Sequence, residues 1–191
     1  MFARTERLLL RPGWAEDAPA LHRAWSDEAI ARALPGHLAA ATREDALRFL
    51  TRERDALSPW FLLFARTGGA PRLVGGCGID GGSPGGLGGR PELAFWIARP
   101  FWGLGFATEA AGAVVRMTRA AGIGPLVARP AAGNGAAGNV LRKIGFRSTG
   151  RRDGAAGSGA IAHMLFEDSG AAPVPVDSSH ELYMDRAPIA A

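Results

Sequence analysis

The stretch Trp102-Gly-Leu-Gly-Phe-Ala-Thr-Glu109 decides the fold, because it joins two segments whose residue patterns have different periods. Residues 92–97 before it alternate as a strand does, and residues 107–121 after it repeat small and apolar residues at helical spacing. Glycine lets such a turn approach a ligand closely, and the following helix presents unpaired amides and a positive dipole end. The stretch predicts a phosphate-binding turn, although ordinary structural turns share this composition.

The remaining segments extend this strand and helix into one mixed α/β domain. Gly68 and Gly69 indicate a hairpin between two of the strands, and residues 161–166 and 181–184 compete for the place of the last strand. Residues 1–168 are expected to form the domain, and residues 169–191 a linker and C-terminal segment able to add an edge strand. Strands are expected at residues 7–11, 60–65, 73–79, 92–97, 126–128 and from 146, and helices at 17–25, within 27–41, at 42–57, 107–121 and 134–144.

Composition narrows the class of protein. A chain of 191 residues fits one domain, and its single cysteine, Cys77, excludes an intramolecular disulfide and is expected to be a buried structural thiol. Charged residues interrupt the amino-terminal apolar run, and no apolar stretch is long enough to span a membrane. The formal charge of +4 comes from scattered arginines. We therefore expect a cytoplasmic protein with neither a membrane nor a nucleic acid as partner.

The sequence resembles a known family. The stretch from Trp102 to Glu109 is similar to the acetyl-CoA pyrophosphate loop of GNAT acetyltransferases, whose pattern is Q/R-x-x-G-x-G/A. Gly105 and Ala107 match its last two positions, and a tryptophan at the first position resembles the Rim-type branch of ribosomal-protein N-terminal acetyltransferases. Three more segments, within a resemblance that covers residues 5–150, match that branch in order: residues 7–12, 74–76 and 134–146.

The resemblance implies a central, mixed but mostly antiparallel sheet of six to seven strands, flanked by about four helices, in which strands four and five splay apart. It also implies transfer of an acetyl group from acetyl-CoA to a primary amine, by direct attack in a ternary complex and without a metal. The residues expected to contact CoA are Trp96, Ile97, Trp102, Gly103, Leu104, Gly105, Phe106, Ala107, Thr108 and Asn134.

The acid and base of such a reaction are harder to assign. Glu92, which begins the strand expected to carry the thioester, is the candidate general base, and a solvated carboxylate is the alternative. The helix positions where relatives carry serine or tyrosine are Ala137 and Val140, so no acid is expected there. Tyr183, the only tyrosine, would supply an acid if the C-terminal segment folds over the site.

The sequence is also compatible with two other functions. A non-catalytic acyl-CoA-binding module fits the missing acid, and an unrelated nucleotide-binding domain fits the glycine-rich turn alone. The amine acceptor is not indicated by any motif, and a homodimer is left open.

Overall fold

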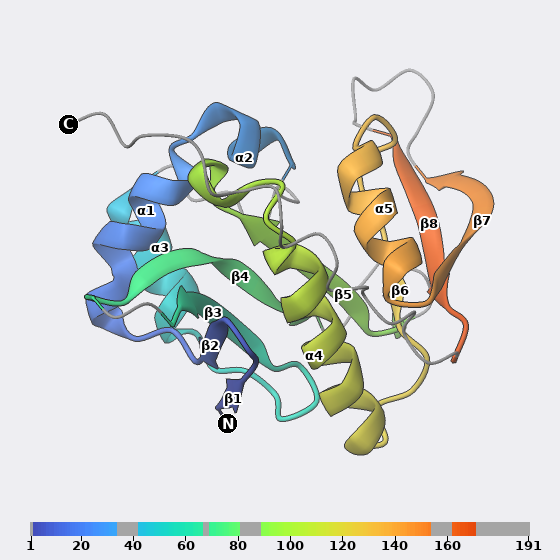
Figure 1. Ribbon diagram of the computed structural model, residues 1–191, viewed down its shortest axis with the longest axis horizontal. Coiled ribbons are helices and arrows are strands. Elements are labelled where there is room, and N and C mark those ends of the chain that lie inside the picture. The colour runs from blue at the N-terminus through green and yellow to red at the C-terminus, as the bar shows by residue number, and fades with distance from the viewer. Residues whose placement is uncertain (1, 34–41, 67–68, 81–88, 154–161, 171–191) are drawn as a thin grey trace.

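The computed structural model describes residues 2–33, 42–66, 69–80, 89–153 and 162–170 (Figure 1). The elements are, in order, β1 (Ala3–Arg4), β2 (Leu8–Arg11), α1 (Ala18–Trp25), α2 (Glu28–Ala33), α3 (Arg43–Thr51), β3 (Trp60–Ala65), β4 (Arg72–Asp80), β5 (Glu92–Ile97), α4 (Phe106–Ala120), β6 (Val127–Ala128), α5 (Gly135–Lys143), β7 (Phe146–Asp153) and β8 (His163–Asp168). The 3₁₀ turns η1 (Ala15–Asp17) and η4 (Arg99–Phe101) precede α1 and α4.

All eight described strands belong to one sheet, in the order β1-β2-β3-β4-β5-β6-β8-β7. Every neighbouring pair is antiparallel except β5 and β6, which are parallel. The expected mixed, mostly antiparallel sheet is confirmed, as is the β3–β4 hairpin. The count exceeds the expected six to seven strands because β1 has only two residues, too few to show a pattern in the sequence, whereas β6 lies within the strand expected at residues 126–128. The described helices number five, in the five ranges where the sequence indicates them, against about four implied by the resemblance.

Strands β5 and β6 separate almost as soon as they meet. Their register contains a single pair, Glu92 with Val127, at the beginning of β5. On its other edge β5 pairs with β4 over its whole length, from Glu92 to Ile97. The expected splaying of these two strands is therefore present, and it opens a gap in the middle of the sheet.

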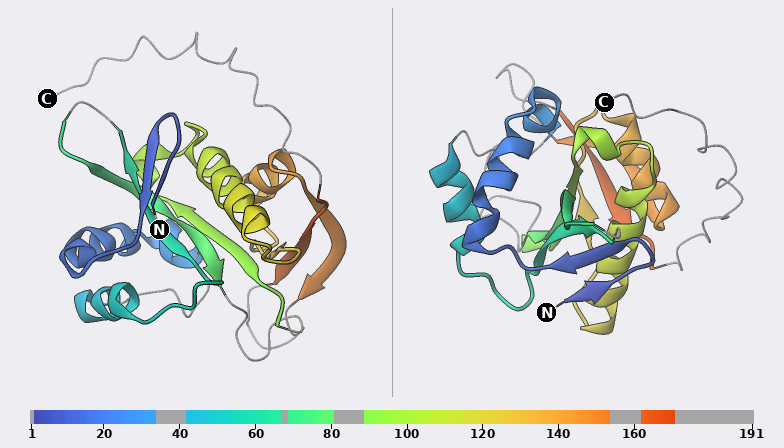
Figure 2. Two further views of the ribbon diagram at one scale, coloured as in Figure 1. Left: turned by 90° about the horizontal axis from the view of Figure 1, so that it is seen from below. Right: turned by 60° about the vertical axis from the view of Figure 1, so that its left-hand side comes forward.

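Each face of the sheet has its own apolar core, and the left view of Figure 2 shows α1 and α3 on one face with α4 and α5 on the other. Strand β5 contributes to both, as its alternation predicts. Leu93 lies in the cluster beneath α4 with Phe95 and Ile97 packed against it, whereas Trp96 joins the cluster beneath α1 and α3. Gly76 of β4 makes room for the indole, since a Cβ there would lie 2.5 Å from Trp96 Nε1.

Helix α3 begins as the sequence predicts but ends early. The Thr42 hydroxyl accepts from the amide of Asp45 at 3.1 Å, and the carboxylate of Asp45 accepts from the amide of Thr42. The expected continuation to Leu57 is wrong: Arg52 already has extended dihedral angles, and the Leu57 side chain is exposed. Without a buried apolar face, the segment after Thr51 has no packing energy to keep it helical.

The ends of α4 and α5 match their expected signals. Gly122 has a φ of 69° directly after the C-cap residue of α4, and Asn134 accepts from the amide of Ala137 at 3.0 Å to cap α5. Of the two candidates for the last strand, residues 161–166 overlap β8, which pairs with both β6 and β7. The other candidate, with Tyr183, lies outside the described residues.

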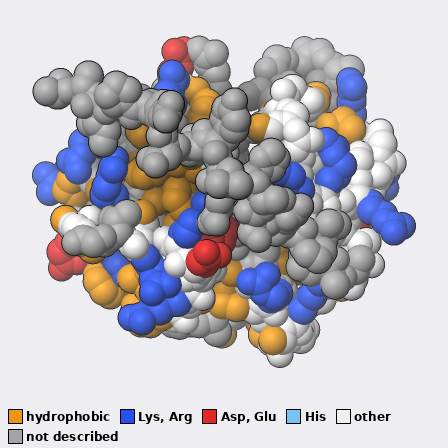
Figure 3. All heavy atoms as spheres, viewed as in Figure 1, with side chains coloured by type: hydrophobic (Ala, Val, Ile, Leu, Met, Phe, Trp, Pro, Cys, Tyr) orange, Lys and Arg blue, Asp and Glu red, His pale blue; other side chains and the backbone are white. Residues whose placement is uncertain are grey.

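The described helices include none that is long and apolar enough to cross a membrane. Lysine and arginine side chains are spread over the face shown in Figure 3 and do not gather into one basic patch there.

Candidate functional site

The turn after β5 has the geometry that its glycines predict. Gly103 and Gly105 have φ values of 76° and 78°, in the left-handed region that side chains with a Cβ avoid. Gly105 is the N-cap of α4 and has no side chain to occupy the helix end. The amides of Phe106, Ala107 and Thr108 belong to the first turn, whose N–H groups have no acceptor within the helix. Turn and helix together present a cluster of donors that suits an anion.

The exposed backbone of β5 is a second set of donors. The amide of Ala98 donates to Val74 of β4 at 2.8 Å, and successive amides of an extended strand point to opposite edges. The amides of Phe95 and Ile97 therefore point away from β4 and into the gap left by β6, whereas that of Trp96 points toward β4. Since β6 pairs with β5 at Glu92 alone, the amides of Phe95 and Ile97 are open to a bound molecule.

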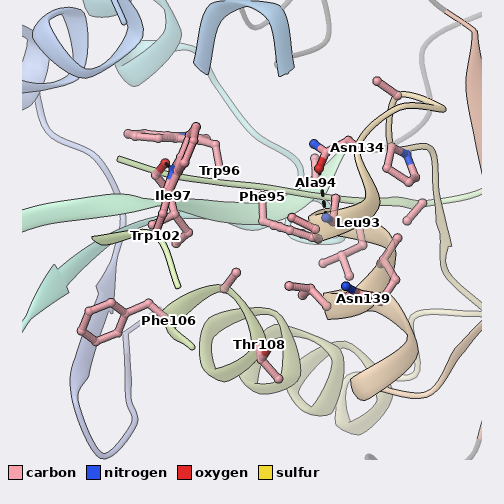
Figure 4. A pocket seen from close by; sticks show the side chains of 18 of the residues that line it. Leu93, Ala94, Phe95, Trp96, Ile97, Trp102, Phe106, Thr108, Asn134 and Asn139 are labelled. Carbon is pink, nitrogen blue, oxygen red and sulfur yellow. Dashed lines mark hydrogen bonds between the residues drawn. The ribbon is translucent and has the colours of Figure 1, made fainter. Parts of the chain in front are cut away.

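A cavity of about 730 Å³ connects the turn with the gap between the strands. Its walls come from all of β5, from the turn and first residues of α4, and from one face of α5 with the segment that precedes it (Figure 4). Ala29 and Ile30 of α2 also line it, although α2 lies on the opposite side of the sheet from α4. The cavity thus reaches both faces of the sheet through the gap beside β5.

Most of the residues expected to contact CoA line this cavity. They are Trp96, Ile97, Trp102, Gly103, Gly105, Phe106, Ala107, Thr108 and Asn134. Leu104 does not line it, because its side chain packs against the core beneath α4. Phe95, Asn139 and Lys143 line the cavity as well and were not expected from the sequence.

Trp102 connects the turn to the strand. Its indole Nε1 donates to the carbonyl oxygen of Ile97 at 2.6 Å, and its ring is half-exposed at the cavity wall. The guanidinium of Arg99 lies 5.7 Å from the centre of that ring and forms an ion pair with Asp27, which precedes α2. The hydrogen bond to Arg99 holds the pKa of Asp27 below its usual value of 3.8. The turn, β5 and α2 are thereby tied together around the cavity.

Glu92, the candidate base, lines the cavity at the end distant from the turn. Its Oε2 accepts from Arg129 Nε at 2.9 Å and from Nη2 at 2.6 Å, and the Glu92 side chain is 15% exposed. Arg129 follows β6, so this ion pair joins the two splayed strands just where they meet. The sequence could not indicate the pairing because the two residues become neighbours only through the parallel contact of β5 with β6.

Cys77 lies within β4 and does not line the cavity. The side chain is fully buried, and burial raises the pKa of its thiol far above the usual value. The expectation of a buried structural thiol is confirmed. Among the described residues, no group of three or more His, Cys, Asp or Glu side chains is placed to hold a metal ion.

Known proteins resemble this chain in sequence and in fold. The family described as "Acetyltransferase (GNAT) domain" matches residues 7–147. A protein assigned to the GnaT family of acetyltransferases, from Bordetella pertussis, is 26% identical, with a TM-score of 0.69 over 88% of this chain and 99% of that chain. A GNAT-family acetyltransferase from Bacillus anthracis is 23% identical, with a TM-score of 0.72 over 87% and 97%.

RimL, a ribosomal L7/L12 alpha-N-protein acetyltransferase whose structure was solved with coenzyme A, is 16% identical, with a TM-score of 0.70 over 87% of this chain and 97% of that chain. At this level of identity the likeness concerns the fold. No curated protein matches the sequence significantly.

Proposed function

Because this chain belongs to the GNAT acetyltransferase family, we propose that it transfers an acetyl group from acetyl-CoA to a primary amine by direct attack in a ternary complex. The observation that carries the proposal is the cavity beside β5, which combines open strand amides with an anion-binding turn and extends through the sheet. The amine is that of a protein N-terminus, a peptide or a small molecule.

The turn suits the diphosphate of the donor. The amides at the start of α4 supply hydrogen bonds and the helix dipole supplies a positive end, so no lysine is required. The two positive-φ glycines leave this surface without Cβ atoms and allow close approach. The proposed diphosphate contacts are the backbone from Gly103 to Thr108.

The edge of β5 suits the pantetheine arm and the thioester. An amide of Phe95 or Ile97 can donate to the thioester carbonyl, whose oxygen becomes negative when the amine nitrogen attacks the carbon. The new C–N bond forms as the C–S bond breaks, and CoA leaves as a thiolate. Donors held in place by the sheet need no rearrangement as this charge develops, which favours the transition state.

The attacking amine must first lose a proton, because an α-amine has a pKa of about 7.7–8.0 and a lysine amine about 10.4. We propose Glu92 as the acceptor of that proton. Glu92 lies five residue steps along the extended strand from Ile97, a distance of roughly 16 Å at about 3.3 Å per step, so the proton would move through ordered water. The role of Tyr183 as an acid stays a prediction, and a thiolate with a pKa of about 8.5 can leave without one.

The face of the sheet that carries α2 is the proposed side of entry for the amine. The cavity reaches Ala29 and Ile30 there, opposite to the turn and α4, so acceptor and donor would meet within the gap from the two faces. RimL is named for acetylation of a ribosomal protein, which supports an amine acceptor but does not identify this one.

An acceptor screen tests the proposal. The full-length protein is incubated with acetyl-CoA and a panel of peptides, polyamines, amino acids and aminoglycosides, and mass spectrometry detects the acetylated product. The Gly105→Glu variant is the control, because a side chain at this positive-φ position strains the turn and brings a negative charge close to the proposed diphosphate site, so it should eliminate both CoA binding and transfer. Failure of the wild type to bind CoA would refute the proposal.

A wild-type protein that binds CoA but acetylates no amine of the panel would instead favour the non-catalytic acyl-CoA-binding module. The absence of a serine or tyrosine acid at Ala137 and Val140 is compatible with that alternative. In that case a Glu92→Gln change would leave the affinity for acetyl-CoA unaltered.

A further inference from the structure

Arg7, in the turn between β1 and β2, contacts the middle of the glycine-rich turn that follows β5 and the first part of α4. Its Nη1 donates to the carbonyl oxygen of Leu104 at 2.9 Å, and its Nε donates to Glu109 Oε2 at 2.8 Å. Nη2 lies 2.7 Å from the same carboxylate oxygen, and the guanidinium carbon lies 4.7 Å from the centre of the Phe106 ring. One side chain therefore spans the turn and the first part of α4.

Glu109 receives further hydrogen bonds from the same β1–β2 turn. The Thr5 hydroxyl donates to Oε1 at 2.5 Å, and the backbone amide of Arg7 donates to Oε1 at 2.9 Å. The Glu109 side chain is only 16% exposed. Both carboxylate oxygens are thus held by a segment about a hundred residues away in the sequence.

Arg7 lies behind the turn and does not face the cavity. Gly103 and Gly105 line the cavity, whereas Arg7 does not. A Cβ added to Gly105 would lie 3.4 Å from Arg7 Nη2, so the guanidinium packs directly against the backbone of the turn. This position suits a residue that supports the turn from outside the proposed diphosphate site.

We propose that Arg7, Thr5 and Glu109 form a positioning network that holds the turn in its diphosphate-binding conformation before the donor arrives. The inference rests on the proposed function, since it assigns the turn to the diphosphate of CoA. Two glycines give the turn a large conformational entropy when it is unsupported. Holding it beforehand reduces the entropy that CoA binding would otherwise remove, which raises affinity.

The network also has an electrostatic consequence. Glu109 places a negative charge near the helix end that would bind a diphosphate, and the guanidinium of Arg7 compensates that charge. Removing the guanidinium would leave a carboxylate that repels the donor. Replacing Arg7 by Gln should therefore weaken CoA binding more than replacing both Arg7 and Glu109 by Gln.

The test measures CoA binding to the full-length protein by calorimetry. Arg7→Lys keeps the charge but cannot contact Leu104 and Glu109 together, and we expect it to raise the dissociation constant for CoA about tenfold. Thr5→Val removes only the hydroxyl and should raise it roughly threefold. The matched control is Arg66→Lys, since Arg66 Nη1 donates to the carbonyl oxygens of Thr5 and Glu6 in the same turn without reaching residues 102–109.

A second ligand separates positioning from general loss of structure. Pantetheine lacks the diphosphate, so Arg7→Lys should leave its affinity, measured by ligand-observed NMR, unchanged. Equal weakening of pantetheine and CoA, equal weakening by Arg7→Lys and Arg66→Lys, or wild-type CoA affinity in both Arg7→Lys and Thr5→Val would each overturn the inference. Absence of CoA binding in the wild type would refute the proposed function, whereas normal binding by the variants would refute only this network.

Discussion

The conformation of Gly105 can be tested by comparing alanine substitutions at the two ends of α4. Gly105 precedes the helix with a φ of 78°, and Gly122 follows it with a φ of 69°. An L-residue in this region costs about 1–2 kcal/mol, so both variants should lose that much free energy of unfolding. Melting temperatures should fall by roughly 2–4 °C for each kcal/mol in a protein of this size.

The two substitutions differ in what the new methyl group meets. At Gly105 the Cβ would lie 3.4 Å from Arg7 Nη2, next to the proposed diphosphate contacts, whereas at Gly122 nothing lies within 4 Å. We therefore expect Gly105→Ala to weaken CoA binding about tenfold and Gly122→Ala to leave it unchanged, because only the first strains the proposed diphosphate turn and its contact with Arg7.

Denaturation with and without CoA measures this difference. At a CoA concentration about 100 times the wild-type dissociation constant, binding adds ~2.7 kcal/mol to the stability of the wild type and of Gly122→Ala. A tenfold weaker Gly105→Ala variant would gain only ~1.4 kcal/mol. If Gly105→Ala gained the full wild-type increment, the assignment of this turn to the diphosphate would be refuted.

Three other substitutions test separate parts of the structure. Glu92→Gln should lower kcat by at least about 100-fold if Glu92 removes the proton from the amine, as rates with an identified acceptor would show. Asp17→Asn removes a carboxylate whose pKa lies below 3.8, because the hydrogen bonds from Arg11 and the Trp14 amide outweigh the opposing effect of burial. Its loss should lower the free energy of unfolding by about 1–3 kcal/mol at neutral pH, measured in urea. Thr42→Ala should cost about 1 kcal/mol in the same assay, because it removes the cap of α3.

Each of these predictions has a control. Glu167→Gln alters a carboxylate that pairs with Arg90 and does not line the cavity, so a similar fall in kcat there would contradict a specific role for Glu92. The ionised carboxylate of Asp17 stabilises the folded state at pH values above its usual pKa. This contribution disappears as the pH falls through the lowered pKa that the group has in the folded protein. The stabilities of wild type and Asp17→Asn should therefore begin to converge as the pH falls below about 3.8 and meet only below the lowered pKa, and a constant difference would exclude the ion pair as its source. Thr51→Ala, at the other end of α3, should cost less than Thr42→Ala.

Local sequence patterns predicted most of the elements, since capping and alternation depend on neighbouring residues. The alternation from Glu92 to Ile97 placed Trp96 and Leu93 on opposite faces, and the structure puts them in separate cores. The same reasoning predicted the end of α3 wrongly. Leu57 fits the apolar spacing of a longer helix, but its side chain is exposed and packs into neither core.

The turn from Trp102 to Glu109 could be identified without coordinates because its chemistry is local: two glycines with positive φ and the beginning of a helix lie within a few residues of one another. The sequence by itself thus determined the family and the place of the anion-binding backbone. Tertiary structure alone decided which strand amides are open, since that depends on where β6 leaves β5. It likewise paired Glu92 with Arg129 and placed Arg7 behind the turn, because contacts between distant segments arise only when the chain packs.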